Sequence, residues 1–183
     1  MRLLIVFLLF CLFGEAAASE PKRIAISFAD NPINALEAFS LAKQHMERFP
    51  EPWLMRKSDG AYAWSYTHGL VLLGMERLYR QSGDEALAQY IRSYADHFID
   101  ADGKIETLEI TEFNIDSIKA GNILFFLYER TQDPRYRRAM DSLQLQLEWQ
   151  PRTHSGGFWH KRKYPWQIWL DGLYMAQPFR AEY

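Results

Sequence analysis

An aspartate stands inside an otherwise apolar and aromatic stretch, PWQIWLDGLYMAQPF, at residues 165–179. Asp171 follows Trp169 and Leu170 and precedes Leu173. An ionised carboxylate in such surroundings costs free energy unless the group is paired or keeps its proton. Because a carboxyl that keeps its proton can act as a general acid, Asp171 is the first candidate for a catalytic residue.

A second aspartate, Asp116, occupies the corresponding position of an earlier segment. DSIKAGNILFFLY aligns with DGLYMAQPFRAEY, which places Asp116 on Asp171, 55 residues later (171 − 116), and Tyr128 on Tyr183. Neighbouring helices pack roughly 8–10 Å apart, so equivalent residues on them would face one rim of the fold. The two aspartates could form an acid/base pair, or each could only stabilise the start of its helix through the helix dipole.

Four further residues could contact a ligand near these aspartates. His160 lies in the loop THSGGFWHKRKYP, and Trp169 follows it; a histidine can donate to a sugar hydroxyl, and a tryptophan can stack on a sugar ring. Trp64 and Tyr66 stand at the start of an earlier apolar helix, where core packing is the alternative. No HExxH-like spacing or phosphate-binding glycine loop is present, so we expect no metal and no organic cofactor.

These residues belong to a chain whose apolar pattern predicts helices throughout. Six amphipathic segments are separated by short polar links, and almost nothing alternates with the period of a strand. Gly83 is a predicted C-cap, and Asp84, Asn114 and Asp133 are predicted N-caps. The fold class is therefore all-α. The expected helices span 33–49, 64–83, 84–100, 114–131, 133–149 and a segment beginning near Pro165.

The helical segments also repeat. LYRQSGDEALAQYIRSYADHF aligns with LYERTQDPRYRRAMDSLQLQL at an offset of 49 (128 − 79), which places Tyr79 on Tyr128. Each unit is an apolar helix, a short turn and a more polar helix, so we expect stacked helical hairpins in a solenoid or an α/α toroid. The pattern stops mid-repeat at Tyr183. We therefore expect residues 19–183 to be a truncated N-terminal portion of such a domain, poorly stable in isolation.

The N-terminus and the charge indicate where the protein works. Residues 1–18 have a basic start, an apolar run and three final alanines, which is typical of a secretory signal peptide and predicts an exported protein. Cys11 would leave with this segment, so the mature chain would hold neither a disulfide nor a thiolate metal site. A net charge of −2 gives no argument for nucleic acid, and we expect no membrane contact after cleavage. The oligomeric state stays open.

Three segments resemble a known enzyme family. They are GGFWHKRKYPWQIWLDGLYMAQPFRAEY, FNIDSIKAGNILFFLYERTQDPRYRRA and AWSYTHGLVLLGMERLY. They are similar to the unsaturated rhamnogalacturonyl hydrolases of glycoside hydrolase family 105, which are related to the unsaturated glucuronyl hydrolases of family 88. This resemblance implies an (α/α)6 toroid, of which the chain would supply about half.

The resemblance also implies a reaction and roles for the selected residues. The family removes a terminal 4,5-unsaturated uronic acid from oligosaccharides left by polysaccharide lyases, by hydration of the C4=C5 bond and without a cofactor. Asp171 matches its general acid/base and Asp116 the partner of that residue. Tyr66, His160 and Trp169 match its sugar-contacting positions.

Two other functions remain compatible with the residues themselves. Asp116 and Asp171 could be an inverting pair that hydrolyses ordinary β-glycosides. Alternatively, the chain could be a non-enzymatic helical-repeat scaffold that binds a partner on its concave face.

Overall fold

The computed structural model describes residues 32–55 and 62–183. The predicted signal peptide at residues 1–18 lies outside these ranges and stays a prediction. Within them the chain is helical, and its only β-type pairings are the isolated bridges Ile99–Ile105 and Arg152–Phe158. The α-helices are α1 (Pro32–Arg48), α2 (Tyr66–Ser82), α3 (Glu85–Phe98), α4 (Asp116–Lys119), α5 (Ile123–Thr131), α6 (Pro134–Trp149) and α7 (Asp171–Glu182), and the 3-10 helices are η2 (Pro52–Leu54), η3 (Ile110–Glu112) and η4 (Ala120–Asn122). The all-α prediction is confirmed.

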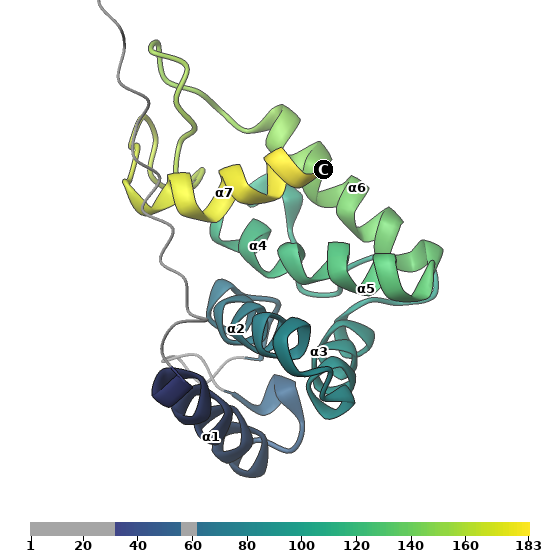
Figure 1. Ribbon diagram of the computed structural model, residues 1–183. Helices are drawn as coiled ribbons and strands as arrows, with labels where there is room; N and C mark the ends of the chain where they lie inside the picture. The colour runs from purple at the N-terminus through teal and green to yellow at the C-terminus, as the bar shows by residue number, and fades with distance from the viewer. Residues whose placement is uncertain (1–31, 56–61) are drawn as a thin grey trace, which may run out of the picture.

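The helices are arranged as successive hairpins (Figure 1). α2 and α3 form one hairpin, α4 to α6 form the next, and α7 packs beside α4. The inner helices α2, α4–α5 and α7 therefore follow one another, with α4 in contact with both α2 and α7, and the outer helices α3 and α6 pack against them. This is the two-helix repeat that the sequence predicts.

The turns within the hairpins, between α2 and α3 and between α5 and α6, use the predicted capping residues. Gly83 ends α2 with φ 69°, a left-handed conformation that glycine adopts at little cost. The side chains of Asp84 and Asp133 accept hydrogen bonds from the backbone N–H groups of Ala86 and Arg135 at the starts of α3 and α6. These caps satisfy donors that have no partner inside the helix, and they fix where each second helix begins.

The predicted helix at 114–131 is divided into α4, η4 and α5. η4 packs against α2, where the backbone of Gly69 approaches Ala120 so closely that a Cβ on Gly69 would lie 2.6 Å from the Ala120 Cα. Asn114, the predicted N-cap, accepts a hydrogen bond from the backbone N–H of Asp116 with its side chain. The inner helix thus begins as predicted and tightens where α2 crosses it.

The start of the last helix was predicted incorrectly. α7 begins at Asp171, whereas the apolar pattern placed its start near Pro165. Residues 165–170 form a loop in which Trp166 has φ 64°, a left-handed conformation that a helix excludes. The correction places Asp171 in the first turn of α7, where the helix dipole favours a negative charge.

The core lies between the inner and outer helices. Its fully buried side chains include Tyr94 of α3, Ile118 of α4, Leu143 of α6 and Phe179 of α7. The buried Lys119 places its ammonium 3.9 Å from the centre of the Tyr174 ring, which joins α4 to α7 through a cation–π contact. Burial lowers the pKa of Lys119. The two helices that carry the aspartates are therefore held together.

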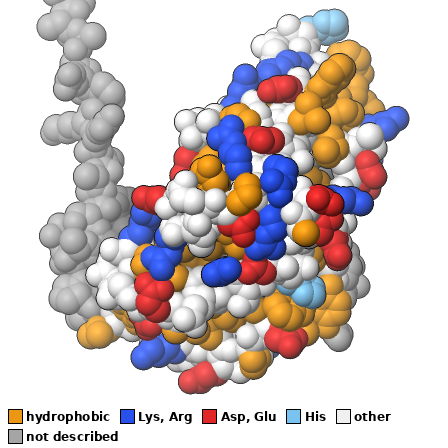
Figure 2. Space-filling view, turned by 90° about the vertical axis from the view of Figure 1, so that its right-hand side faces the viewer, with side chains coloured by type: hydrophobic (Ala, Val, Ile, Leu, Met, Phe, Trp, Pro, Cys, Tyr) orange, Lys and Arg blue, Asp and Glu red, His pale blue; other side chains and the backbone are white. Residues whose placement is uncertain are grey.

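The charges are distributed without separation on the surface that Figure 2 shows. Lys and Arg side chains are intermingled with Asp and Glu side chains on that face, in keeping with the small net charge. Among the described residues, no helix combines the length and the apolar character that crossing a membrane requires.

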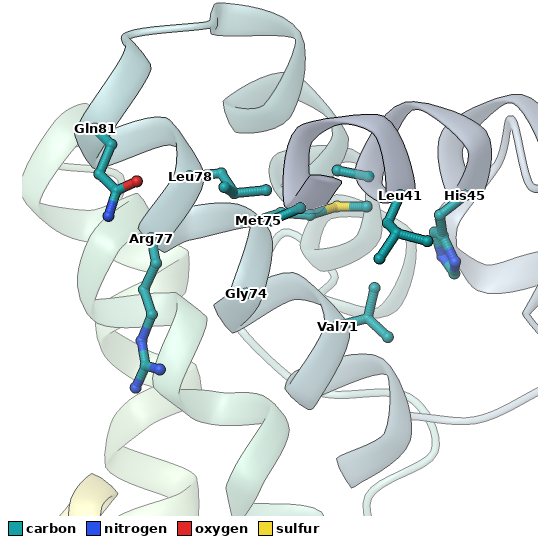
Figure 3. Close-up of a pocket in the computed structure, with 10 residues that line it drawn as sticks. Leu41, His45, Val71, Gly74, Met75, Arg77, Leu78 and Gln81 are labelled. Atoms are coloured by element: carbon teal, nitrogen blue, oxygen red, sulfur yellow. The ribbon is translucent and has the colours of Figure 1, made fainter. Parts of the chain in front are cut away.

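An apolar groove of about 510 Å³ lies between α1 and α2 (Figure 3). Its apolar walls include Leu41 of α1 and Val71, Met75 and Leu78 of α2, and His45 and Arg77 lie at its edges. Leu41 is 65% exposed. Exposed apolar surface of this kind promotes association between molecules.

We expect the purified chain to self-associate through this groove. Leu41→Gln should weaken the association at least about tenfold, because burying a leucine side chain contributes about 1.5–3 kcal/mol. Leu145→Gln, on the exposed face of α6 and outside the groove, is the control and should change little. Sedimentation velocity measures both, and equal effects of the two substitutions would exclude the groove as the contact.

Candidate active site

The two aspartates begin the inner helices α4 and α7. Asp116 is the first residue of α4, and Asp171 is the first residue of α7. Because these helices pack side by side with both N-terminal ends toward the loop at 150–170, the carboxylates converge at one rim (Figure 1). The repeat offset in the sequence predicts this juxtaposition.

His160 lies between the two carboxylates. Its Nε2 is 3.2 Å from Asp116 Oδ1, and its Nδ1 is 4.0 Å from Asp171 Oδ1. The side chain of His160 is only 1% exposed. The sequence predicts this histidine as a sugar contact, and the structure makes it a bridge between the aspartates.

Backbone hydrogen bonds hold His160 in this position. Its N–H donates to the carbonyl of Gln167 at 2.8 Å, and its own carbonyl accepts from the N–H of Ile115 at 3.2 Å. Ile115 immediately precedes Asp116, and Gln167 precedes α7 by four residues. The loop at 150–170 is thereby tied to the starts of both inner helices.

Lys161 completes the cluster and was not predicted from the sequence. Its Nζ lies 2.6 Å from Asp116 Oδ2, and both side chains are largely buried, at 18% and 13% exposure. An ion pair shielded from water is attenuated by the solvent less than a surface pair. The sequence feature that could have indicated Lys161 is its position directly after His160, in the basic run HKRK. We use "acid cluster" for Asp116, His160, Lys161 and Asp171.

The electrostatic surroundings of His160 act in opposing directions. Burial lowers the pKa of its imidazole below the ordinary value of 6.5, the carboxylates of Asp116 and Asp171 raise it, and the Lys161 ammonium lowers it. Burial dominates, so the imidazole is neutral at pH 7. A neutral imidazole has one N–H donor and one acceptor nitrogen, and it can therefore pass a proton or orient a hydroxyl.

Two buried polar atoms of the cluster are not satisfied by hydrogen bonds. In the described part of the chain, His160 Nδ1 and Asp116 Oδ1 are buried and have no hydrogen-bond partner. Buried polar groups are nearly always paired in folded proteins, and exceptions are concentrated at functional sites. Asp116 Oδ1 nevertheless lies 3.2 Å from His160 Nε2, so this unmet hydrogen-bonding capacity belongs to the interior of the acid cluster.

Asp171 is more exposed to solvent than the apolar residues around it in the sequence led us to expect. The expected burial of this aspartate among aromatic side chains is wrong for the described residues, since its side chain is 49% exposed. Leu170, Leu173 and Tyr174 are exposed around it. Within the cluster, Asp171 is thus the carboxylate that a substrate can reach directly.

Trp169 orients His160. Their rings stack with centroids 4.2 Å apart and an interplanar angle of 13°, and Tyr164 stacks on Trp169 at 5.2 Å. The Trp169 Nε1 donates to Gln167 Oε1. Trp169 therefore has a structural task at the site, and its contact with a sugar stays a prediction.

Trp64 and Tyr66 differ in their placement. Trp64 is 3% exposed, stacks on Tyr94 in the core, and donates from Nε1 to the carbonyl of Ser117 at 2.9 Å. This is the core packing that the sequence left open, and it supports α4 directly after Asp116. Tyr66 is the first residue of α2 and is partly exposed, so it stays a predicted sugar contact.

One group of residues could in principle hold a metal ion. Asp116, His160 and Asp171 each offer a ligand atom, and these atoms lie within 4.8 Å of one another. The Lys161 ammonium, however, already supplies a cation 2.6 Å from Asp116. A divalent ion at this position would be repelled by that ammonium.

Comparison with known families identifies the fold to which this cluster belongs. The family model of Glycosyl Hydrolase Family 88 matches residues 38–183, which include the whole acid cluster. The chain belongs to this family.

Solved structures extend the assignment to a related family. The family 105 glycoside hydrolase from C. acetobutylicum ATCC 824 is 35% identical with a TM-score of 0.69, over 79% of this chain and 38% of that one. A possible GH105 member from Salmonella enterica is 26% identical with a TM-score of 0.57, over 84% and 43%. Another from Klebsiella pneumoniae, at 22% identity and a TM-score of 0.59 over 97% and 47%, shares the fold.

This family 88 chain spans less than half the length of the structures that it matches. The predicted relation to families 105 and 88 is confirmed. The all-α hairpin array corresponds to about half of an (α/α)6 toroid, which also agrees with the prediction.

Proposed function

We propose that the protein removes a terminal 4,5-unsaturated uronic acid from oligosaccharides that polysaccharide lyases produce, with rhamnogalacturonan products as substrates. The observation that carries this proposal is the acid cluster, in which one carboxylate is engaged and the other is accessible. Asp116 is paired with Lys161 and faces His160, whereas Asp171 is half exposed. This asymmetry supports Asp171 as the group that exchanges protons with substrate.

The proposed reaction is a hydration. The Asp171 carboxyl protonates C4 of the C4=C5 bond, which leaves an oxocarbenium-like centre at C5. Water adds to C5 and returns a proton to Asp171, and the resulting hemiketal opens to release the aglycone as an alcohol. One carboxyl therefore serves as acid and then as base, and no metal or organic cofactor takes part.

The neighbours of Asp171 support this chemistry in different ways. Asp116 Oδ1 is buried 3.2 Å from His160 Nε2, so Asp116 can act on Asp171 through the imidazole, and the contact of His160 with a sugar stays a prediction. Lys161 balances the charge of Asp116, so the substrate carboxylate meets a less negative site. Trp169 keeps the imidazole in position.

The spacing of the carboxylates disfavours the inverting alternative. An inverting glycosidase keeps its two carboxyls about 6.5–9.5 Å apart to leave room for a water molecule. Here, the His160 imidazole occupies the space between Asp116 and Asp171 where that water molecule would lie, with Nε2 3.2 Å from Asp116 Oδ1 and Nδ1 4.0 Å from Asp171 Oδ1. The non-enzymatic scaffold does not explain why this cluster converges.

A substrate comparison tests the proposal. We expect the purified protein to remove the ultraviolet absorbance of the C4=C5 bond from an unsaturated rhamnogalacturonan disaccharide, and to leave its saturated counterpart intact. An unsaturated glucuronyl disaccharide, run in parallel, tests the preference for pectin products. Release of sugar from the saturated compound would refute hydration and favour an ordinary glycosidase.

A further inference from the structure

Two glutamines at the C-terminal end of the outer helix α6 are buried, Gln146 in its last turn and Gln150 as its C-cap residue. Gln146 and Gln150 lie four residues apart, so both occupy the same face of the helix, and neither side chain is exposed. A buried amide costs free energy unless its donors and acceptor are paired. Leucine or methionine would fill the same space without that cost, so the amides need an explanation.

Their donors hold the two segments that carry the acid cluster. Gln150 Nε2 donates to the carbonyls of Phe113 at 2.7 Å and Trp159 at 2.8 Å. Gln146 Nε2 donates to the carbonyl of Asn114 at 3.0 Å. Phe113 and Asn114 lie three and two residues before Asp116, and Trp159 lies directly before His160. One amide thus joins the segment of Asp116 to the segment of His160.

The backbone at this junction is in an unfavourable conformation. Phe113 has φ 47°, a left-handed conformation that a bulky residue adopts at a cost. Its carbonyl accepts the shorter of the two Gln150 bonds, which helps to maintain this conformation. Asn114 then accepts from the N–H of Asp116, so the orientation set at Phe113 is transmitted to the first turn of α4.

We propose that Gln150, assisted by Gln146, is a positioning residue. From the end of the outer helix it sets the distance between Asp116 and His160. Neither glutamine needs to touch the substrate, and the effect passes through the carbonyls of Phe113, Asn114 and Trp159. Its catalytic consequence rests on the proposed function. Its structural consequence does not.

The titration of His160 reports the effect of the glutamine hydrogen bonds without any substrate. The charged and titratable groups that face the imidazole are Asp116 of α4, Asp171 of α7 and the adjacent Lys161. Burial lowers the pKa of His160 more than the carboxylates raise it. If the hydrogen bonds from Gln150 are lost, water reaches the His160 ring, and the pKa of His160 should rise toward 6.5.

The experiment replaces Gln150 with methionine, which keeps the length of the side chain and removes both donors. Imidazole NMR titration of the full chain, with His160→Asn to assign the signal, should show a raised pKa of His160. Gln144→Met is the matched control, because the amide of Gln144 donates only to Glu148 on its own helix. This control should leave the titration unchanged.

Activity gives the second measurement. Gln150→Met should lower kcat about 10–100-fold with little change in KM, since small displacements of catalytic groups have effects of this size. An unchanged His160 titration in folded Gln150→Met would overturn the proposal. Should that variant not fold, Gln146→Met, which loses the bond to the Asn114 carbonyl and the longer bond to Gln150 Oε1, must raise the pKa of His160 by less. An unmoved pKa of His160 in that variant also overturns the proposal. Failure of the proposed function would appear differently, as an inactive wild type with the titration shift intact.

Discussion

Replacing Asp171 with asparagine should abolish the release of unsaturated uronate while the fold stays intact. The amide has the shape of the carboxyl but cannot give a proton to C4 and take one back from water. We expect a loss of about 10²–10⁴-fold in kcat, which is the usual contribution of general acid–base catalysis. Because Asp171 is half exposed, the substitution leaves no buried group unpaired, and thermal stability should stay near that of the wild type.

The control for this prediction is Asp141→Asn. Asp141 is an exposed carboxylate of the outer helix α6, where it pairs with Arg137 and accepts from Tyr183. It lies outside the acid cluster and should leave kcat unchanged. Turnover at the wild-type rate in Asp171→Asn would show that this aspartate only favours the start of α7.

The parts of the fold that depend on local chemistry could be predicted from the sequence. Helix caps at Gly83, Asp84 and Asp133 are short-range hydrogen bonds, and each lies where the residue type indicated it. The repeat offset likewise placed Asp116 and Asp171 at equivalent helix starts. The capping signals reside within a few residues of the helix ends that they specify, and the repeat offset compares two such helix starts 55 residues apart.

The errors arose where distant segments determine the structure. The apolar run before Asp171 has a helical composition, yet the carbonyl of Gln167 accepts from His160, and Trp169 stacks on the His160 ring. These contacts stabilise a loop with Trp166 in a left-handed conformation, and α7 starts later as a result. Periodicity within one segment carries no information about such partners.

The set of site residues predicted from the sequence was incomplete for the same reason. Lys161 looked like one member of a solvated basic run, and Gln150 like a polar residue at the end of a helix. Their roles depend on Asp116, Phe113 and Trp159, which lie 9 to 45 residues away along the chain. By contrast, Trp64 was given two interpretations, and its burial against Tyr94 favours the core.

Replacing Asp116 with asparagine should change the titration of His160 as well as the rate. The Asp116 carboxylate raises the pKa of His160 against the larger, opposite effect of burial. Without that charge, the pKa of His160 should fall further below 6.5. Imidazole NMR titration of the wild type and the variant measures this shift, and kcat should fall at least about tenfold because a positioned acceptor is lost.

The same change alters how stability depends on pH. A histidine whose pKa is lowered by folding binds fewer protons in the folded state than in the unfolded state between the lowered value and 6.5. Stability therefore decreases as the pH falls from 6.5 toward the folded-state pKa, and it is fully present above that window. In Asp116→Asn the window extends to lower pH, so the loss of stability on acidification should be larger. Thermal melts at a series of pH values between 7 and the onset of acid unfolding measure this effect.

A comparison with a simple helix cap decides between the two roles of Asp116. Asparagine caps a helix about as well as aspartate, so a residue that only caps should tolerate this substitution without a change in stability. Asp84 is such a cap, since its side chain accepts from the N–H of Ala86 at the exposed start of α3. Asp84→Asn should leave the titration of His160, the melting curves and kcat unchanged. If Asp116→Asn behaves in the same way, Asp116 only supports the start of α4 and does not act with Asp171 through His160. If the pKa of His160 falls and kcat falls with it, the two aspartates and the histidine form one electrostatic unit.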